Sequence, residues 1–227
     1  MSRTFECITA FVAALSFAVL GGCAGKQTPG PFSGADSARI LAAIALHRAE
    51  ADSFFRHDPA SPFLNDSSAH FDGIRWFPPE VGFTFTSALH RYPYPTTVTV
   101  FGTKGEERKQ LRYGYFLFAV DGEEVRLNVY KYTMADPKRY EQNRHYLSVW
   151  FTDETTGKET YEVGRYLDVG EEQPAADALY TLNFNNAYNP YCAYSARYSC
   201  AIPTKEDHLD VSIRAGEMKY GEMKSHQ

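Results

Sequence analysis

The chain has 227 residues, of which 44% are hydrophobic and 15% aromatic, and its formal net charge at pH 7 is −5. This hydrophobic content is enough to bury a core, which excludes a largely disordered chain. The sequence has no long run of Lys or Arg. It therefore lacks the basic surface that binds phosphate backbones, and we expect no nucleic-acid partner.

The N-terminus has the pattern of an export signal. Residues 7–20 (CITAFVAALSFAVL) are apolar and too short to span a bilayer. The following LGGC, at positions 20–23, resembles the lipobox of bacterial lipoproteins, in which the Cys thiol receives diacylglycerol before the signal is cut. We therefore expect a signal peptide over residues 1–22 and an acylated Cys23 that anchors the chain in a lipid bilayer. In well-studied Gram-negative lipoproteins, a residue other than Asp directly after the acylated Cys directs the protein to the outer membrane. Ala24 at this position therefore indicates the outer membrane, facing the periplasm.

An ordinary secretory signal that happens to end in a Cys is the alternative.

Residues 23–36 are rich in Gly and Pro and predict a flexible tether between the lipid and the folded domain. We expect that domain to cover residues 37–217 and to be followed by a frayed tail over residues 218–227.

The domain begins with hydrophobic residues at helical spacing. They are Ile40, Leu41, Ile44, Ala45, Ala51, Phe54 and Phe55. Asp58-Pro59 predicts the end of the helix. We expect an amphipathic helix that packs on a sheet, and a membrane-lying helix is the less favoured alternative.

Strand-like segments dominate the rest of the domain. They cover residues 71–77, 81–87, 96–101, 110–120, 124–133, 146–152, 163–169, 179–184 and 209–213. Asp121-Gly122 predicts a tight hairpin, because both residues tolerate positive φ. Since no βα alternation or internal repeat is visible, the predicted fold class is mainly β (α+β), an antiparallel β-sandwich or barrel-like sheet with one N-terminal amphipathic helix.

Cys192 and Cys200 are the two cysteines outside the signal and the anchor. An even pair in an exported domain predicts a disulfide, which would contribute about 2.5–3 kcal/mol. The alternatives are a metal site or a thiolate nucleophile that uses His208, but the spacing matches no usual zinc pattern. No phosphate-binding loop, dinucleotide fingerprint or zinc-protease motif appears, so we expect no metal and no cofactor.

Residues 149–217 concentrate polar side chains among aromatic ones. The segment contains FTDETTG, ETY, GRYL, NFNNAYNPYCAY and AGE, beginning at residues 151, 159, 164, 183 and 215. These motifs resemble the bacterial family called domain of unknown function 1684. Asn183 replaces the Asp that is common in this family, and Asp207-His208 departs from its usual residues. The resemblance implies no activity, because none is established for the family.

Arg165 is the most conspicuous polar residue of this segment. It could hold a ligand carboxylate or phosphate, or it could pair internally with Asp153 or Glu159. We favour internal pairing, because a buried guanidinium is usually satisfied within the protein. Asp153 is expected to cap its own turn.

Four amides, Asn183, Asn185, Asn186 and Asn189, lie close to Tyr188 in the sequence. They could bind a sugar or hold an irregular loop, and loop scaffolding is the favoured role because Asn readily bonds nearby backbone groups.

Three function classes remain open. The first is a binding module for a small ligand, a glycan or an envelope protein, with Arg165, Tyr161, Tyr188 and the Asn residues lining a pocket. The second is a structural envelope protein without a pocket. The third is a hydrolase of envelope material, with Glu159 or Asp153 as acid/base and Arg165 as oxyanion partner.

Overall fold

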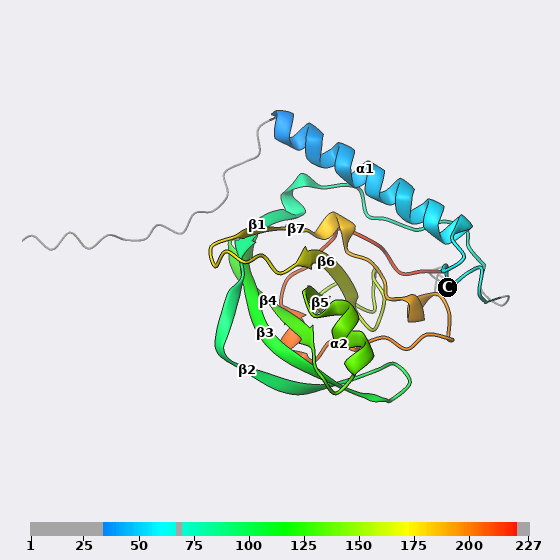
Figure 1. Ribbon diagram of the computed structural model, residues 1–227. Coiled ribbons are helices and arrows are strands. Elements are labelled where there is room, and N and C mark those ends of the chain that lie inside the picture. Colours follow the sequence, from blue (N-terminus) through cyan, green and yellow to red (C-terminus); the bar gives the residue numbers. More distant parts are fainter. Residues whose placement is uncertain (1–33, 67–69, 222–227) are drawn as a thin grey trace, which may run out of the picture.

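The computed structural model describes residues 34–66 and 70–221, which fold around a curved antiparallel sheet (Figure 1). Its strands are β2 (His90–Phe101), β3 (Glu107–Val120), β4 (Glu123–Tyr132), β5 (Tyr146–Asp153), β6 (Arg165–Glu171) and β8 (His208–Leu209). β2 to β6 are paired in chain order, and β8 pairs in parallel with β5. β1 (Thr84–Ala88) and β7 (Leu179–Asn183) form a separate two-stranded sheet. The predicted β-rich class is confirmed, and in the described part of the chain the strands form no closed barrel.

The turn between β3 and β4 is the predicted hairpin. Asp121 and Gly122 have φ angles of 50° and 87°, as two-residue hairpin turns require. β2 begins earlier than the expected start at residue 96, because His90 and Arg91 already pair with β3 before the ladder shifts register. The Pro residues between the two paired parts donate no N–H group, which is why the sequence indicated a later start.

Three predicted strands and one helix differ from expectation. In the strand expected over residues 81–87, residues 81–83 form a short 3₁₀ helix and β1 begins at Thr84. Within residues 71–77 only Trp76 pairs, in an isolated bridge to Glu217, and the last strand is limited to β8. The helix α2 (Pro137–Asn143) was not predicted. Asp136 accepts a hydrogen bond from the Arg139 N–H at 3.1 Å, and Pro137 occupies the first turn, a favourable helix start.

The main core lies between the large sheet and the two-stranded sheet. Phe184 is fully buried at its centre. Its ring contacts Phe85 of β1, Phe118 of β3 and Phe151 of β5, with centroids 5.2–5.9 Å apart. One aromatic side chain therefore joins both sheets.

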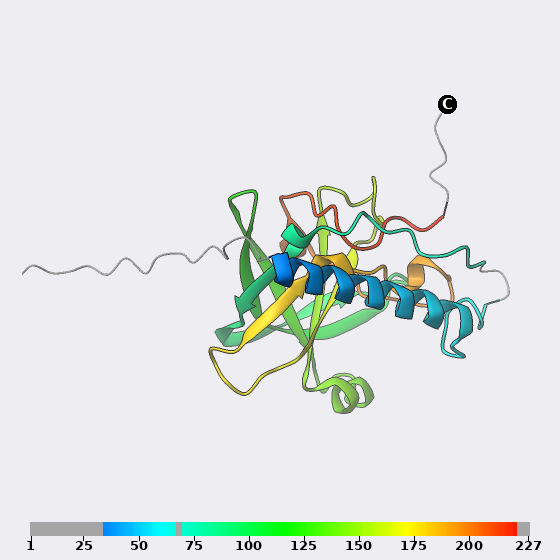
Figure 2. The same cartoon turned by 90° about the horizontal axis from the view of Figure 1, so that it is seen from above.

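The long helix α1 (Gly34–His57) lies across the body of the molecule (Figure 2). It begins at Gly34, so the last three residues of the tether predicted over residues 23–36 are helical. Only Ile44 and Phe55 are buried, and Leu46 is 61% exposed. None of the described helices has the length and hydrophobicity needed to cross a bilayer.

Some of the sequence predictions concern the two ends of the chain, beyond the residues that the structure describes. The signal over residues 1–22 and the lipid site at Cys23 lie outside the described residues. Met218 and Lys219, which were expected to belong to a frayed tail, are hydrogen-bonded to the domain: the Met218 N–H donates to the Arg75 carbonyl at 2.8 Å and the Lys219 N–H to the Glu159 carbonyl at 2.9 Å.

Candidate functional site

Arg165, the first residue of β6, lies in a buried cluster of polar groups that also contains Asp153 and the carbonyls of Ile213 and Ala215. We call this cluster the polar node. The Arg165 guanidinium pairs with Asp153 at 2.6 Å, and neither side chain is more than 1% exposed. Its other donors bind the carbonyl of Ile213 at 2.8 Å and that of Ala215, while the Phe151 ring lies 5.2 Å away. The internal pair that we favoured is therefore present, with Asp153 as the partner.

Asp153 also holds the turn after β5. Its Oδ1 accepts the Thr155 N–H at 2.7 Å and its Oδ2 faces Arg165, so the predicted turn cap is confirmed. Glu159, the other proposed acid/base, pairs with Arg214 at 2.9 Å. Neither carboxylate lines either of the two cavities described below, which gives the hydrolase hypothesis no support.

Glycines allow the chain to pass close to this node. Gly216 has a φ of 80°, and a Cβ there would lie 2.5 Å from the Ala187 carbonyl oxygen. Gly164 has a φ of 107°, and its Cβ would lie 2.6 Å from the Phe151 carbonyl oxygen. Any side chain at these positions would displace backbone that carries the node.

The amide side chains hold loops in place. Asn185 is fully buried, and its side chain accepts from the Glu80 N–H and donates to the Glu80 carbonyl, both at 2.8 Å. Asn189 donates to the Met218 carbonyl at 2.9 Å. Asn186 Oδ1 is buried without a partner among the described residues. None of the three amides lines either cavity.

Tyr161 lies beside the two cysteines. Its hydroxyl donates to Cys192 Sγ at 3.8 Å, and the Cys192 N–H donates to Cys200 Sγ at 3.4 Å. Both thiols are free, so the disulfide expected from the sequence between Cys192 and Cys200 is not present in the structure. A hydrogen bond from Cys200 lowers the pKa of Cys192 to about 6, while the same interaction raises the pKa of Cys200. Within this pair, the pKa of Cys192 is therefore the lower of the two.

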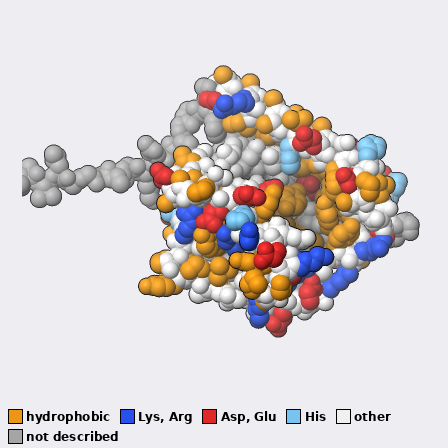
Figure 3. All heavy atoms as spheres, viewed as in Figure 1, with side chains coloured by type: hydrophobic (Ala, Val, Ile, Leu, Met, Phe, Trp, Pro, Cys, Tyr) orange, Lys and Arg blue, Asp and Glu red, His pale blue; other side chains and the backbone are white. Residues whose placement is uncertain are grey.

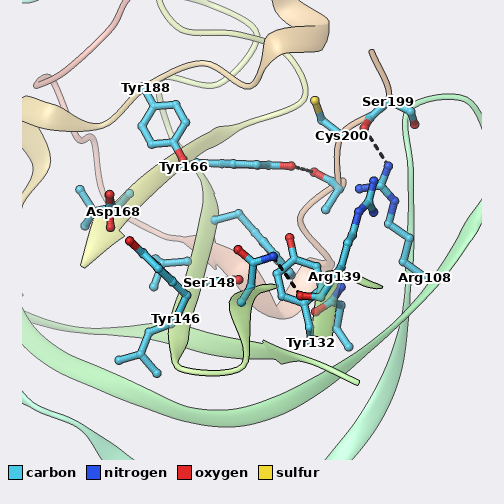
Figure 4. Close-up of a pocket in the computed structure, with 17 residues that line it drawn as sticks. Arg108, Tyr132, Arg139, Tyr146, Ser148, Tyr166, Asp168, Tyr188, Ser199 and Cys200 are labelled. Atoms are coloured by element: carbon cyan, nitrogen blue, oxygen red, sulfur yellow. Dashed lines mark hydrogen bonds between the residues drawn. The ribbon is translucent and has the colours of Figure 1, made fainter. Parts of the chain in front are cut away.

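A cavity of about 390 Å³ lies against the large sheet (Figure 4). We call it the sheet cavity. Side chains from β3, β4, α2, β5, β6 and residues 188–201 line it, among them Arg108, Gln110, Tyr132, Arg139, Tyr166 and Tyr188. Of the ligand-binding residues predicted from the sequence, only Tyr188 contributes to this lining.

The Tyr166 ring forms one wall of the sheet cavity. Its hydroxyl donates to the Ala201 carbonyl at 2.7 Å (Figure 4), and its ring centroid lies 6.0 Å from that of Trp150 and 5.9 Å from that of Tyr188. The hydrogen bond and the ring contacts fix this wall between the sheet and the segment after residue 188.

Gln110 is the unusual polar residue of the sheet cavity. It is only 4% exposed, and its Oε1 has no hydrogen-bond partner among the described residues. An unpartnered buried acceptor costs about 1–3 kcal/mol. Nearby, Arg108 donates to the Ser199 carbonyl at 2.7 Å, and Arg139 is partly exposed. The lining therefore combines aromatic rings, two Arg side chains, of which Arg108 is paired with Glu106 at 2.5 Å, and a Gln whose buried acceptor has no partner among the described residues.

A second cavity, of about 620 Å³, lies beneath α1. We call it the helix cavity. Six aromatic residues line it, namely Phe54, Phe55, Tyr166, Tyr188, Tyr191 and Tyr198, and it shares Tyr166, Tyr188, Ser199 and Cys200 with the sheet cavity. The surface is hollowed below α1, with hydrophobic side chains around the hollow (Figure 3). The two cavities thus adjoin at a common wall.

Glu217 is a buried carboxyl in the lining of the helix cavity. It is 2% exposed, and its Oε2 accepts from the Asn189 N–H at 2.8 Å and from the Tyr194 hydroxyl. Burial raises the pKa of Glu217 to about 7. Such a shift is typical of functional sites and of buried structural groups alike.

Substituting Glu217 should change how stability depends on pH. The folded state holds the Glu217 proton up to a pKa of about 7, whereas an unfolded Glu titrates near about 4.3. The stabilisation from protonation is full below the unfolded pKa and is lost as the pH rises through the folded pKa. We expect the free energy of unfolding of the wild type, relative to Glu217→Gln, to fall across this window and then level off in urea titrations. A difference that is constant with pH would contradict this expectation.

Apart from Tyr188, the residues that line the two cavities were not among the ligand-binding candidates from the sequence. Gln110 and Arg108 belong to β3, and Tyr166 directly follows Arg165 in β6. No motif marked Gln110 or Arg108. Glu217 ends the AGE motif, so the signal was visible in the sequence, but no role was drawn from it.

Comparisons with known proteins support the fold and the family but no activity. A solution structure of an uncharacterized protein from Haloarcula marismortui is 28% identical, with a TM-score of 0.59, and the match covers 82% of this chain and 97% of that one. The search of curated proteins gave no match. The family model for "Protein of unknown function (DUF1684)" matches residues 69–218. The chain belongs to the DUF1684 family of proteins of unknown function.

Proposed function

We propose that this protein is a lipid-anchored binding module of the cell envelope and that the sheet cavity takes a small, hydroxyl-rich ligand. The observation that carries the proposal is the unpartnered Gln110 Oε1 in the lining of an aromatic-walled cavity. Ligand sites combine apolar walls with a few placed polar groups. A ligand hydroxyl that donates to Gln110 would satisfy an acceptor that the described chain leaves unpaired.

The other polar groups suit a hydroxylated ligand of sugar-like chemistry. Arg139 is 44% exposed and Asp168 also lies in the lining, so donors and acceptors are both within the cavity. The rings of Tyr132, Tyr146 and Tyr188 offer flat surfaces for the apolar faces of a sugar ring. This combination of rings and polar groups in one cavity favours a binding module over a structural protein without a pocket.

Substituting Gln110 separates binding from stability. In Gln110→Leu we expect unchanged or slightly higher stability, by about 1 kcal/mol, because an unpartnered buried acceptor is removed. We also expect about tenfold weaker binding, since one lost hydrogen bond is worth roughly 1.4 kcal/mol. NMR titration with glucose, N-acetylglucosamine and glucuronic acid measures the binding, and urea unfolding measures the stability.

Gln173→Leu is the matched control, because Gln173 is exposed and lines neither cavity. It should leave binding unchanged. If none of the three sugars binds, or if Gln110→Leu binds as tightly as the wild type, the proposed site is wrong.

The proposed anchor and disulfide are tested together by mass spectrometry of the unreduced mature protein. We expect an N-terminal peptide that begins at a diacylglycerol-modified Cys23, since two or more acyl chains anchor a protein stably. We also expect that Cys192 and Cys200, whose thiols are free in the structure, are oxidised to a disulfide in the envelope, so that the peptide holding both has a mass lower by two hydrogens. An intact Met1 and two alkylatable thiols would contradict both parts.

A further inference from the structure

The lining of the helix cavity is acidic and aromatic. It contains two carboxylates, Glu50 and Glu217, and neither Lys nor Arg. His47 also lines it, and burial lowers the pKa of this imidazole, which keeps it neutral at pH 7. No cation in the lining therefore balances the two carboxylates.

The side-chain hydrogen bonds of Glu217 gather on one oxygen. The Asn189 N–H, at 2.8 Å, and the Tyr194 hydroxyl both donate to Oε2. Arg165 is the cation that interacts with this carboxyl electrostatically, but Arg165 already forms its own ion pair with Asp153 at 2.6 Å. A carboxyl that is 2% exposed thus lines a cavity without a counter-ion of its own.

The rings around the helix cavity are turned in different directions. Tyr191 and Tyr198 meet edge to face, with centroids 5.3 Å apart and an interplanar angle of 78°. Tyr166 and Tyr188 do the same at 5.9 Å and 71°. Ring faces carry partial negative charge, so rings that enclose a space from several sides attract cations.

We propose that the helix cavity binds a small organic ammonium ion, held against the tyrosine rings with Glu217 as its counter-ion. The charge of the lining excludes an anionic ligand, and the rings favour an alkylated cation over a strongly hydrated inorganic one. The volume of about 620 Å³ is within the range of small-molecule sites. This site is separate from the one proposed for the sheet cavity, although the two share a wall.

Choline and its neutral isostere 3,3-dimethylbutan-1-ol test the proposal, because they share a shape and differ in charge. Isothermal titration calorimetry on the full-length mature protein is performed at a pH above the pKa of Glu217, which burial raises to about 7. We expect saturable choline binding at least about tenfold tighter than that of the alcohol, as a desolvated cation–aromatic contact supports. Equal affinities, or no choline binding, would overturn the proposal.

Variants test whether the difference in affinity between choline and the alcohol arises in the helix cavity. Glu217→Gln keeps an acceptor for the Tyr194 hydroxyl and the Asn189 N–H, and it should lose about tenfold in choline affinity without change for the alcohol. Glu123→Gln removes an exposed carboxylate outside both linings and should change neither affinity. If Glu217→Gln fails to fold, Tyr198→Leu, at a half-buried residue, should give a comparable loss for choline. Wild-type choline affinity in a folded Glu217→Gln or Tyr198→Leu variant would overturn the assignment.

Discussion

Arg165→Met is expected to lower the free energy of unfolding by about 3–5 kcal/mol, since removing one partner of a buried ion pair leaves the other charge uncompensated. Asp153 would lose its partner at 2.6 Å, and the carbonyl of Ile213 would lose a donor at 2.8 Å. The guanidinium connects β5 and β6 to residues 213–217, so its loss detaches that segment from the sheet. Urea unfolding of the variant and the wild type measures the difference.

The control is Arg214→Met. Arg214 pairs with Glu159 at 2.9 Å, but its side chain is 62% exposed, and exposed pairs contribute at most about 1 kcal/mol. The double variant Arg165→Met/Asp153→Leu should be less destabilised than the sum of its single variants, because neither charge remains buried alone. If Arg165→Met costs no more than Arg214→Met, the node does not hold the fold together.

Phe184→Ala is expected to destabilise the protein by about 3–5 kcal/mol, the usual cost of removing a fully buried aromatic ring. Phe184 is 0% exposed and contacts rings from both sheets. The resulting cavity would open where β1, β3 and β5 meet, and these elements have little freedom to close it. Guanidinium or urea unfolding gives the value directly.

Phe101→Ala provides the comparison, because Phe101 is 51% exposed at the end of β2. Its loss should be under about 1 kcal/mol. Phe184 lines neither cavity, so a Phe184→Ala variant that stays folded should retain ligand binding. If Phe184→Ala lowers the free energy of unfolding as little as Phe101→Ala does, Phe184 is not at the centre of the core.

Features set by neighbouring residues were predictable from the sequence. The Asp121-Gly122 hairpin and the Asp153 turn depend on groups within a few positions of each other. The start of α2 was also encoded locally, by Asp136 and Pro137, although it was not recognised. Local chemistry therefore set these turns and this helix start.

The candidate site depends on contacts between distant residues. Arg165 among aromatic residues suggested a ligand site, but carbonyls about fifty positions later satisfy its donors. Gln110 gave no signal, because a Gln in a strand is usually exposed and bonded to water. It becomes part of a cavity only when β3 is brought together with β5, β6 and residues 199–201. Sequence patterns cannot show which backbone groups arrive at a side chain.

The most direct measurement is a map of backbone amide shifts as a sugar from the binding panel is added to the protein. If the sheet cavity is the site, the shifts will be largest around Gln110, Ser148 and Tyr166 and will be absent around Thr155. Saturable shifts centred on residues 153–160, with none along β3, would place the site at the polar node instead and contradict the account.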